Sequence, residues 1–384
     1  MKAPEAEAAP IDPARTPEVA EYLAHLTRAD SARGPLITAI HPADEMYLYE
    51  LALGPRGPSA AAVSYFATGD AACRTVLDAL TWRFGDPSGA RLLDFASGHG
   101  RTTRFLVRRL PADRITISEI EPSAVRFQEE TFGVRGVVSA TDPADFRVDG
   151  AFDAIVACSF FSHLPEGRFH QWLARLYGLL APGGMLLFSV HGMRLLAQAE
   201  ADEDVGIVFR AASESRRLEA AEYGTTFVTP GWVRSAATAA TTTTRGESHA
   251  LLAFPHGLCG FQDLYALLRA PLPPALDLRL PRLPLGALER SAVADGRVLL
   301  EGWARGDTDE RAPEVRLVFR NAVAETSPSD GAGGPRRTWR FEFPADAIGP
   351  DDLVRVEAVS ARGLERILVM GTLRPYLPAA GAVS

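Results

Sequence analysis

Hydrophobic and polar positions follow two different patterns along the chain, and the change comes near residue 270. Before it, short apolar runs alternate with segments in which apolar residues recur every three or four positions. This alternation favours a parallel sheet with helices on both faces. The predicted order is strand 90–96, helix 100–110, strand 114–120, helix 122–132, strand 136–141, strand 151–159, helix 167–180 and strand 185–191.

Further elements flank this central alternation. Amphipathic segments at 17–28 and 42–53 and a helix at 70–84 precede the first strand. After the fifth strand, residues 193–235 are predicted to be an insertion of mixed helix and loop. Late strands at 245–254 and 261–269 then complete the sheet.

Beyond residue 270 the pattern changes to short strands of period two. The proline cluster at 270–274 opens a linker, which we place at 271–281. Asp295-Gly296 separates two apolar runs and predicts a hairpin. An antiparallel β-sandwich is therefore expected over 282–376, with strands at 297–304, 314–320, 337–343, 352–359 and 364–370.

The first predicted strand ends in a glycine turn, LLDFASGHGR at residues 92–101, and Glu119 ends the second strand. This layout is typical of a site for an adenosine cofactor, in which glycines let the backbone approach the ligand and a carboxylate accepts hydrogen bonds from the ribose. NAD, FAD and S-adenosylmethionine are the candidates. A dinucleotide turn reads Gly-x-Gly-x-x-Gly, and here the third glycine is missing.

The glycine turn resembles the first motif of the class I S-adenosylmethionine-dependent methyltransferases. Three further segments, 115–122, 151–159 and 179–190, resemble other parts of that family in the same order, and the resemblance covers roughly residues 60–270. It implies an α/β fold with a Rossmann-like, seven-stranded sheet, one late antiparallel strand, and S-adenosylmethionine as cofactor. In this family, N-terminal helices such as 17–28 and 42–53 often form a lid over the cofactor or substrate.

The resemblance also implies which residues contact the cofactor. Ala96 stands where the family usually has glycine, and we expect it to be tolerated provided that its backbone needs no positive φ. Glu119 is the expected ribose acid, with Glu121 on the same strand face as the alternative. Asp142 is expected near the adenine amine, or else in an ordinary solvated turn. The full set is Asp94, Ala96, Ser97, Gly98, Gly100, Glu119, Ile120, Asp142 and Ser159.

Methyl transfer to a hydroxyl requires an aligned acceptor and a group that removes its proton. His163 follows the fourth predicted strand and His191 ends the fifth, at the sheet edge where ligands bind in open α/β folds. Both are candidate bases, because histidine titrates near neutral pH, and a structural hydrogen bond is the alternative role for His163. Arg104 is expected to decorate the first helix, and His99 to pack or to contact the cofactor.

Composition excludes several other classes. The chain has 384 residues, a net charge of −8 and no basic run, so nucleic acid is not an expected partner. No run approaches the roughly 18 apolar residues needed to span a bilayer. Three widely spaced cysteines show no metal-ligand spacing, so we expect no metal site and a cytoplasmic location.

The sequence therefore predicts four parts: a disordered tail at 1–15, a methyltransferase domain with lid helices at 16–270, the linker, and the sandwich. The expected function is methyl transfer from S-adenosylmethionine to a hydroxyl of a small molecule or saccharide. The saccharide enters because the hairpin that leads into Trp303 resembles β-sandwich modules attached to enzymes of bacterial polysaccharide assembly. N- or C-methylation in secondary metabolism, and a non-catalytic binding protein with the same fold, are the alternatives.

Overall fold

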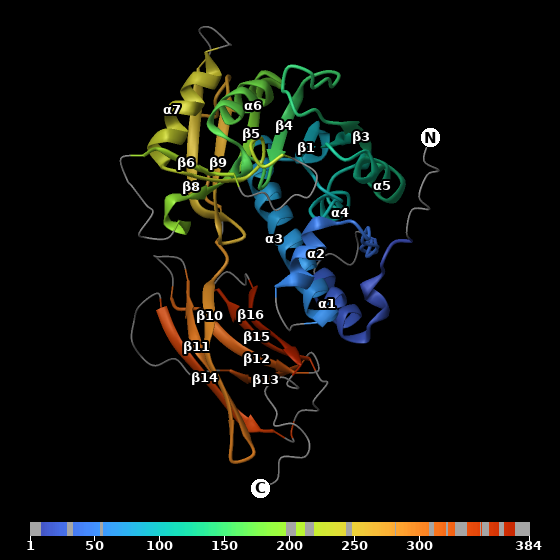
Figure 1. Cartoon of the computed structure of the whole chain (residues 1–384), viewed down its shortest axis with the longest axis vertical. Helices are drawn as coiled ribbons and strands as arrows, with labels where there is room; N and C mark the ends of the chain where they lie inside the picture. Colours follow the sequence, from blue (N-terminus) through green and yellow to red (C-terminus); the bar gives the residue numbers. More distant parts are fainter. Residues whose placement is uncertain are drawn as a thin grey trace. The chain divides into compact units, whose positions relative to one another are not determined.

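The structure is a computed structural model, and two compact units make up the chain (Figure 1). Unit 1 comprises Met1–Ile11, Asp30–Met46 and Thr68–Leu280, and unit 2 comprises Asp12–Ala29, Tyr47–Ala67 and Pro281–Ser384. Each unit is described by itself. The residues described are 9–28, 34–53, 57–196, 205–211, 219–242, 248–280, 282–306, 311–319, 322–326, 336–345, 347, 353–360 and 365–372.

Unit 1 is built on a mixed sheet in which the first five strands run parallel. Their spatial order is β3-β2-β1-β4-β5, with β9 antiparallel to β5 and β8 antiparallel to β9. The expected Rossmann-like sheet with one antiparallel late strand is confirmed. The strands are β1 (Leu92–Phe95), β2 (Ile115–Glu119), β3 (Arg135–Val138), β4 (Phe152–Ala157), β5 (Leu180–Gly192), β8 (His249–Leu258) and β9 (Gln262–Arg269).

The helices of unit 1 are α4 (Thr103–Leu106), α5 (Pro122–Phe132), α6 (Glu166–Gly178), α7 (Pro230–Thr241) and the part of α3 (Gly57–Phe84) that begins at Thr68. The helix predicted over 100–110 is reduced to the four residues of α4. Tight turns replace it on both sides, where Gly100 N–H donates to the Ser97 carbonyl and Arg109 N–H to the Leu106 carbonyl. The prediction of a regular helix there was wrong because the glycine turn continues into the first helical turn.

The insertion after β5 contains a β-hairpin that its sequence did not predict. Strands β6 (Ile207–Arg210) and β7 (Thr225–Val228) pair antiparallel, and β7 pairs parallel with the last two residues of β5. The sheet thereby grows from seven strands to nine. Strand β5 thus pairs with β9 along Met185–Val190 and with β7 at His191 and Gly192.

Aromatic side chains fill the space between the sheet and helix α6. Trp172 of α6 lies 4.9 Å from the Phe95 ring at the end of β1, and Phe161 lies 5.2 Å from Phe188 of β5, measured between ring centroids. Edge-to-face and tilted contacts of this kind fix ring orientation as well as burying area. This cluster anchors the carboxyl ends of β1, β4 and β5, where the candidate site lies.

Unit 2 contains an antiparallel β-sandwich, as expected. One sheet has the order β10-β11-β14, with β10 (Leu285–Ala294), β11 (Arg297–Arg305) and β14 (Arg336–Pro344). The other has the order β13-β12-β15-β16, with β12 (Glu314–Phe319), β13 (Ala322–Thr326), β15 (Leu353–Val359) and β16 (Glu365–Thr372). Both sheets contribute to one core, which includes Leu300 and Phe341 from the first and Leu317 and Val356 from the second.

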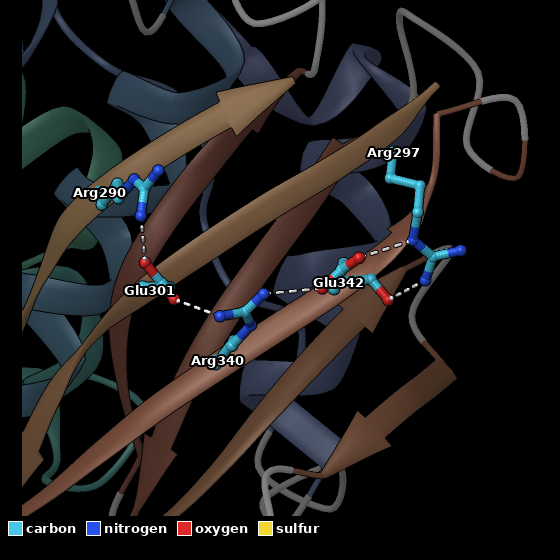
Figure 2. Close-up of polar contacts among 5 residues, drawn as sticks. All are labelled: Arg290, Arg297, Glu301, Arg340 and Glu342. Atoms are coloured by element: carbon cyan, nitrogen blue, oxygen red, sulfur yellow. Dashed lines mark hydrogen bonds and ion pairs between the residues drawn. The ribbon is translucent and has the colours of Figure 1, made fainter. Parts of the chain in front are cut away.

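The outer faces of the two sheets differ. Helix α1 (Pro17–Thr27) packs on the four-stranded sheet, where the Arg355 guanidinium lies 5.5 Å from the Tyr22 ring centroid and His25 Nε2 lies 2.9 Å from a Glu365 oxygen. On the three-stranded sheet, charged side chains form a ladder of ion pairs 2.8–3.4 Å long (Figure 2). The ladder runs through Arg290, Glu301, Arg340, Glu342 and Arg297.

At the N-terminal end, residues 1–8 of the expected tail lie outside the described residues. Ile11 pairs with Ile40, and Pro13–Arg15 form a short 3-10 helix. Helix α2 (Glu45–Ala52) follows α1, and a lid role for these two helices stays a prediction. Among the helices that the structure describes, none has both the length and the hydropathy to cross a membrane.

Candidate active site

The glycine turn after β1 has three residues in the left-handed region of backbone space. Ala96 has φ +55°, Gly98 +58° and Gly100 +82°. Our expectation that Ala96 would avoid positive φ was wrong. An L-residue pays roughly 1–2 kcal/mol for this conformation, so the turn holds Ala96 under strain.

The two glycines of the turn are required for different reasons. A Cβ atom added at Gly100 would overlap the Phe132 ring and the Gln128 side chain, so Gly100 permits close packing of α5. A Cβ added at Gly98 would meet no atom within 4 Å. Gly98 therefore borders open space, where a ligand can approach its backbone.

Glu119 at the end of β2 lies directly against this turn. One carboxylate oxygen accepts a hydrogen bond from Gly98 N–H at 2.8 Å, and the other accepts from Ile120 N–H at 2.7 Å. Burial raises the pKa of Glu119, while both hydrogen bonds act in the opposite direction. Glu121, the alternative ribose acid, is instead the N-cap residue of α5.

Two buried side chains that the sequence did not reveal hold the turn in place. The Gln128 amide nitrogen of α5 donates to Ser97 Oγ and to the Gly98 carbonyl, each at 2.8 Å. Arg104, expected on the surface of the first helix, is fully buried and donates to the carbonyls of Gly100, Ile37 and Ala39. The expectation was wrong because the guanidinium turns inward, where it donates to backbone carbonyls of two separate segments.

Asp94 is the third residue of β1, next to the last residue of the strand, and is 4% exposed. Its carboxylate accepts a hydrogen bond from Thr103 Oγ1 at 2.8 Å. Burial raises the pKa of Asp94 to about 6, and the charge of Glu119 adds to the shift while the Thr103 bond opposes it. A direct contact between Asp94 and the cofactor stays a prediction.

Asp142, after β3, already has two protein partners. Its carboxylate accepts from Ala144 N–H at 2.8 Å and from the Arg168 guanidinium at 3.1 Å, and these hydrogen bonds lower its pKa. This is the turn geometry that was the alternative to adenine contact. The adenine role itself stays a prediction.

A polar network joins the ends of β4, β5 and β9. Ser159, with φ +58°, donates its backbone N–H to Ser189 Oγ at 2.7 Å. The hydroxyls of Ser159 and Ser189 both donate to Gln262 Oε1, at 3.2 and 2.6 Å. The Gln262 amide nitrogen lies 3.1 Å from His191 Nε2. Of these four residues, sequence reasoning identified Ser159 and His191 and missed Ser189 and Gln262.

The two candidate bases lie together at this edge, with ring centroids 6.0 Å apart. His163 Nδ1 lies 2.8 Å from the carbonyl oxygen of Gly224, whose N–H in turn donates to the His163 carbonyl at 2.8 Å. The Tyr223 ring stacks on the imidazole at 4.7 Å. The β6–β7 hairpin therefore holds His163 from the side of the insertion.

His191 and His99 lie in different environments. His191 is desolvated and lies near His163 and Arg194, which lowers its pKa to about 4 and leaves it neutral at physiological pH. His99 of the glycine turn stacks on His41 at 4.5 Å between centroids, in agreement with a packing role. Among the described residues, no group of three or more His, Cys, Asp or Glu side chains is placed to hold a metal ion.

Comparison with known proteins agrees with this geometry. Residues 93–186 match the family described as a methyltransferase domain, in agreement with the methyltransferase domain expected there. A curated relative, malonyl-[acyl-carrier protein] O-methyltransferase of Prosthecochloris aestuarii, is 29% identical over 143 residues. The aligned region is 35% of this chain and 52% of the relative, so the chain spans about half the length of that protein.

Solved structures with the same kind of domain are more distant. The 1,6-didemethyltoxoflavin-N1-methyltransferase of Burkholderia thailandensis is 20% identical, with a TM-score of 0.37 over 52% of this chain and 77% of that one. An amino pentose methyltransferase from Micromonospora echinaspora is 18% identical, with a TM-score of 0.38 over 52% of this chain and 90% of that one. With TM-scores this low, these structures do not indicate which methyl acceptor this chain uses.

Proposed function

We propose that this chain, whose residues 93–186 form a methyltransferase domain, transfers a methyl group from S-adenosylmethionine to a hydroxyl of a small molecule or saccharide. The observation that carries the proposal is the position of the Glu119 carboxylate beside Gly98, the turn residue that borders open space. A carboxylate and an accessible backbone at the ends of neighbouring strands suit an adenosine ligand. A cytoplasmic location stays a prediction.

The residues present fit such a cofactor. Glu119 would accept hydrogen bonds from the ribose hydroxyls, while Ser97, Gly98 and Ile120 supply the backbone around it. When bound, the cofactor supplies an electrophilic methyl group on a positively charged sulfur. The protein then has to exclude water, align the acceptor oxygen with that methyl carbon, and take up the hydroxyl proton.

His163 is the residue we propose for the proton. A neutral imidazole whose Nδ1–H donates to the Gly224 carbonyl carries its lone pair on Nε2. In this tautomer Nε2 would take up the proton that the acceptor hydroxyl loses when it is methylated. Gly224 and Tyr223 fix the ring by a hydrogen bond and a stack, which is the orientation that general-base catalysis requires.

Calorimetric titration with S-adenosylmethionine and S-adenosylhomocysteine tests the cofactor site. We expect micromolar binding by the wild type and at least a roughly tenfold loss in Glu119→Ala, because charged hydrogen bonds to a ligand contribute about 1.5–3 kcal/mol. Glu121→Ala is the matched control and should bind as the wild type does. Circular dichroism melts confirm that each variant is folded.

Absence of binding by the folded wild type would overturn the proposal and favour a binding protein that keeps the fold. Equal losses of cofactor affinity in Glu119→Ala and Glu121→Ala would show that Glu119 is not the acid that binds the ribose. Once binding is established, formation of S-adenosylhomocysteine with saccharide, amine and carbon acceptors distinguishes O-methylation from the alternatives.

A further inference from the structure

The network around Gln262 has a defined hydrogen-bond direction. Ser189 and Gln262 are buried, and Ser189 Oγ accepts the backbone N–H of Ser159 at 2.7 Å. Both serine hydroxyls donate to Gln262 Oε1. The carboxamide oxygen therefore faces the serines, and its NH2 group faces His191 at 3.1 Å. An amide nitrogen can only donate, so His191 Nε2 must accept with its lone pair.

A neutral imidazole that accepts at Nε2 carries its hydrogen on Nδ1. His191 Nδ1 is buried and has no hydrogen-bond partner among the described residues. Among the described residues, the contact with Gln262 is therefore the one hydrogen bond that determines which ring nitrogen of His191 carries the hydrogen.

We propose that Gln262 is a positioning residue that holds His191 in its neutral Nδ1–H form, so that His163 is the only proton acceptor of the pair. The catalytic half of this inference, that His163 is the proton acceptor, rests on the proposed function, whereas the tautomer of His191 does not. The role follows from hydrogen-bond direction: the only lone pair of the His191 ring is already engaged by Gln262.

The charges around His191 agree with a neutral ring. His163 lies 6.0 Å away between centroids, and the rings of Phe227 and Phe261 lie 5.6 and 5.8 Å away. Arg194 is ion-paired at 2.7 Å with Asp263, whose other oxygen accepts His256 N–H at 2.8 Å. Both oxygens of the Asp263 carboxylate thus accept from other donors, and the low pKa of His191 follows from burial and from His163 and Arg194.

Neutrality at this position also suits the cofactor class. A methyl donor of the sulfonium type carries a positive charge, and a second positive charge at His191 would oppose its binding in a poorly solvated site. The carboxamide of Gln262 fixes the ring without adding charge, which a glutamate at the same position would not do.

Long-range 1H–15N NMR of the full chain, labelled at histidine, tests the tautomer without any activity. In the wild type we expect the His191 signals of a protonated Nδ1 and an unprotonated Nε2, with no titration between pH 8 and about 5.5. In Gln262→Glu the carboxylate should accept from Nε2–H, reverse the tautomer and raise the pKa of His191 by about 2 units or more. Gln262→Leu is the control of similar size that removes the contact and adds no charge.

An Nε2–H signal in the wild type, or titration of His191 near 6.5, would overturn the assignment. The catalytic half is tested by pH–rate profiles. Gln262→Glu should lower methyl transfer about tenfold at one pH unit below the raised pKa of His191, and activity should recover as His191 loses its proton at higher pH. A profile that keeps its wild-type shape in Gln262→Glu would overturn the positioning role. Failure of the wild type to bind cofactor would overturn the proposed function and the catalytic half, and the NMR result for the tautomer would still hold.

Discussion

Ala96 adopts a left-handed backbone conformation that alanine rarely has. Its backbone has φ +55°, the value at which glycine is normally found, and yet the methyl group is retained. Sequence motifs located the turn, but φ at Ala96 could not be read from them, because an alanine is compatible with either sign until the chain path is known. Gln128 and Arg104 were missed for a related reason: a polar residue on a helix looks solvent-facing until its backbone partners are known.

Replacement of Ala96 by glycine should stabilise the protein. Ala96→Gly removes the left-handed penalty, so we expect the free energy of unfolding to rise by about 1 kcal/mol, partly offset by the greater entropy of glycine in the unfolded chain. Urea unfolding of the wild type and the variant measures this change in the free energy of unfolding. Ala90→Gly is the control, because Ala90 has an ordinary φ of −72° and should lose about 0.5–1 kcal/mol. A loss of stability in Ala96→Gly would contradict the strain.

At the scale of elements, prediction succeeded where local signals and packing agree. Helix α5 has the predicted bounds, because Pro122 stands at its first turn and Gly133 ends it with φ +68°. Strands β6 and β7 were missed because four-residue strands in a polar insertion give almost no periodic signal, and β7 is fixed by pairing with the end of β5. The hairpin matters for function, since it carries the partner of His163.

Gly224 connects the hairpin to His163, and its lack of a side chain is required by the neighbouring strand. An added Cβ would overlap the carbonyl oxygen of Arg210 and the Phe209 ring. Gly224→Ala should displace the hairpin and lower methyl transfer by up to about a hundredfold through misplacement of His163, while the affinity for S-adenosylmethionine changes little.

Steady-state kinetics and calorimetry on Gly224→Ala measure the two effects separately. Gly231→Ala is the matched control, since its nearest atom would be Thr229 Oγ1 at 4.0 Å. Undiminished turnover in Gly224→Ala would show that the hairpin does not position the base.

At the scale of the whole molecule, the proline cluster at 270–274 is not a boundary between two domains that are each continuous in sequence. Unit 2 combines Pro281–Ser384 with Asp12–Ala29 and Tyr47–Ala67. The sequence predicted the antiparallel sheets of the sandwich, because strand alternation is a local signal. It gave no sign that α1 packs on the sandwich, because that contact joins distant segments, Tyr22 with Arg355 and His25 with Glu365.

Truncation after Leu280 should therefore affect the N-terminal helix. The shortened chain lacks the sheet on which α1 packs through Tyr22 and His25, so α1 loses these contacts. We expect proteolytic cleavage within Pro17–Thr27 to become about tenfold faster or more, as shown by mass spectrometry of timed digests. Cleavage within α5 of unit 1 is the internal control. Equal protection of α1 in both chains would contradict its place in unit 2.

The same packing has a consequence for the order in which the protein is made. His25 and Glu365 are 340 positions apart, so α1 leaves the ribosome long before the strand that it pairs with exists. An eleven-residue helix alone is marginal in water. During synthesis α1 therefore stays unfolded or bound to a chaperone while the Rossmann-like sheet of unit 1 forms. Unit 2 can be completed only after β16 has been made, because α1 and β16 are separated in the sequence by most of unit 1.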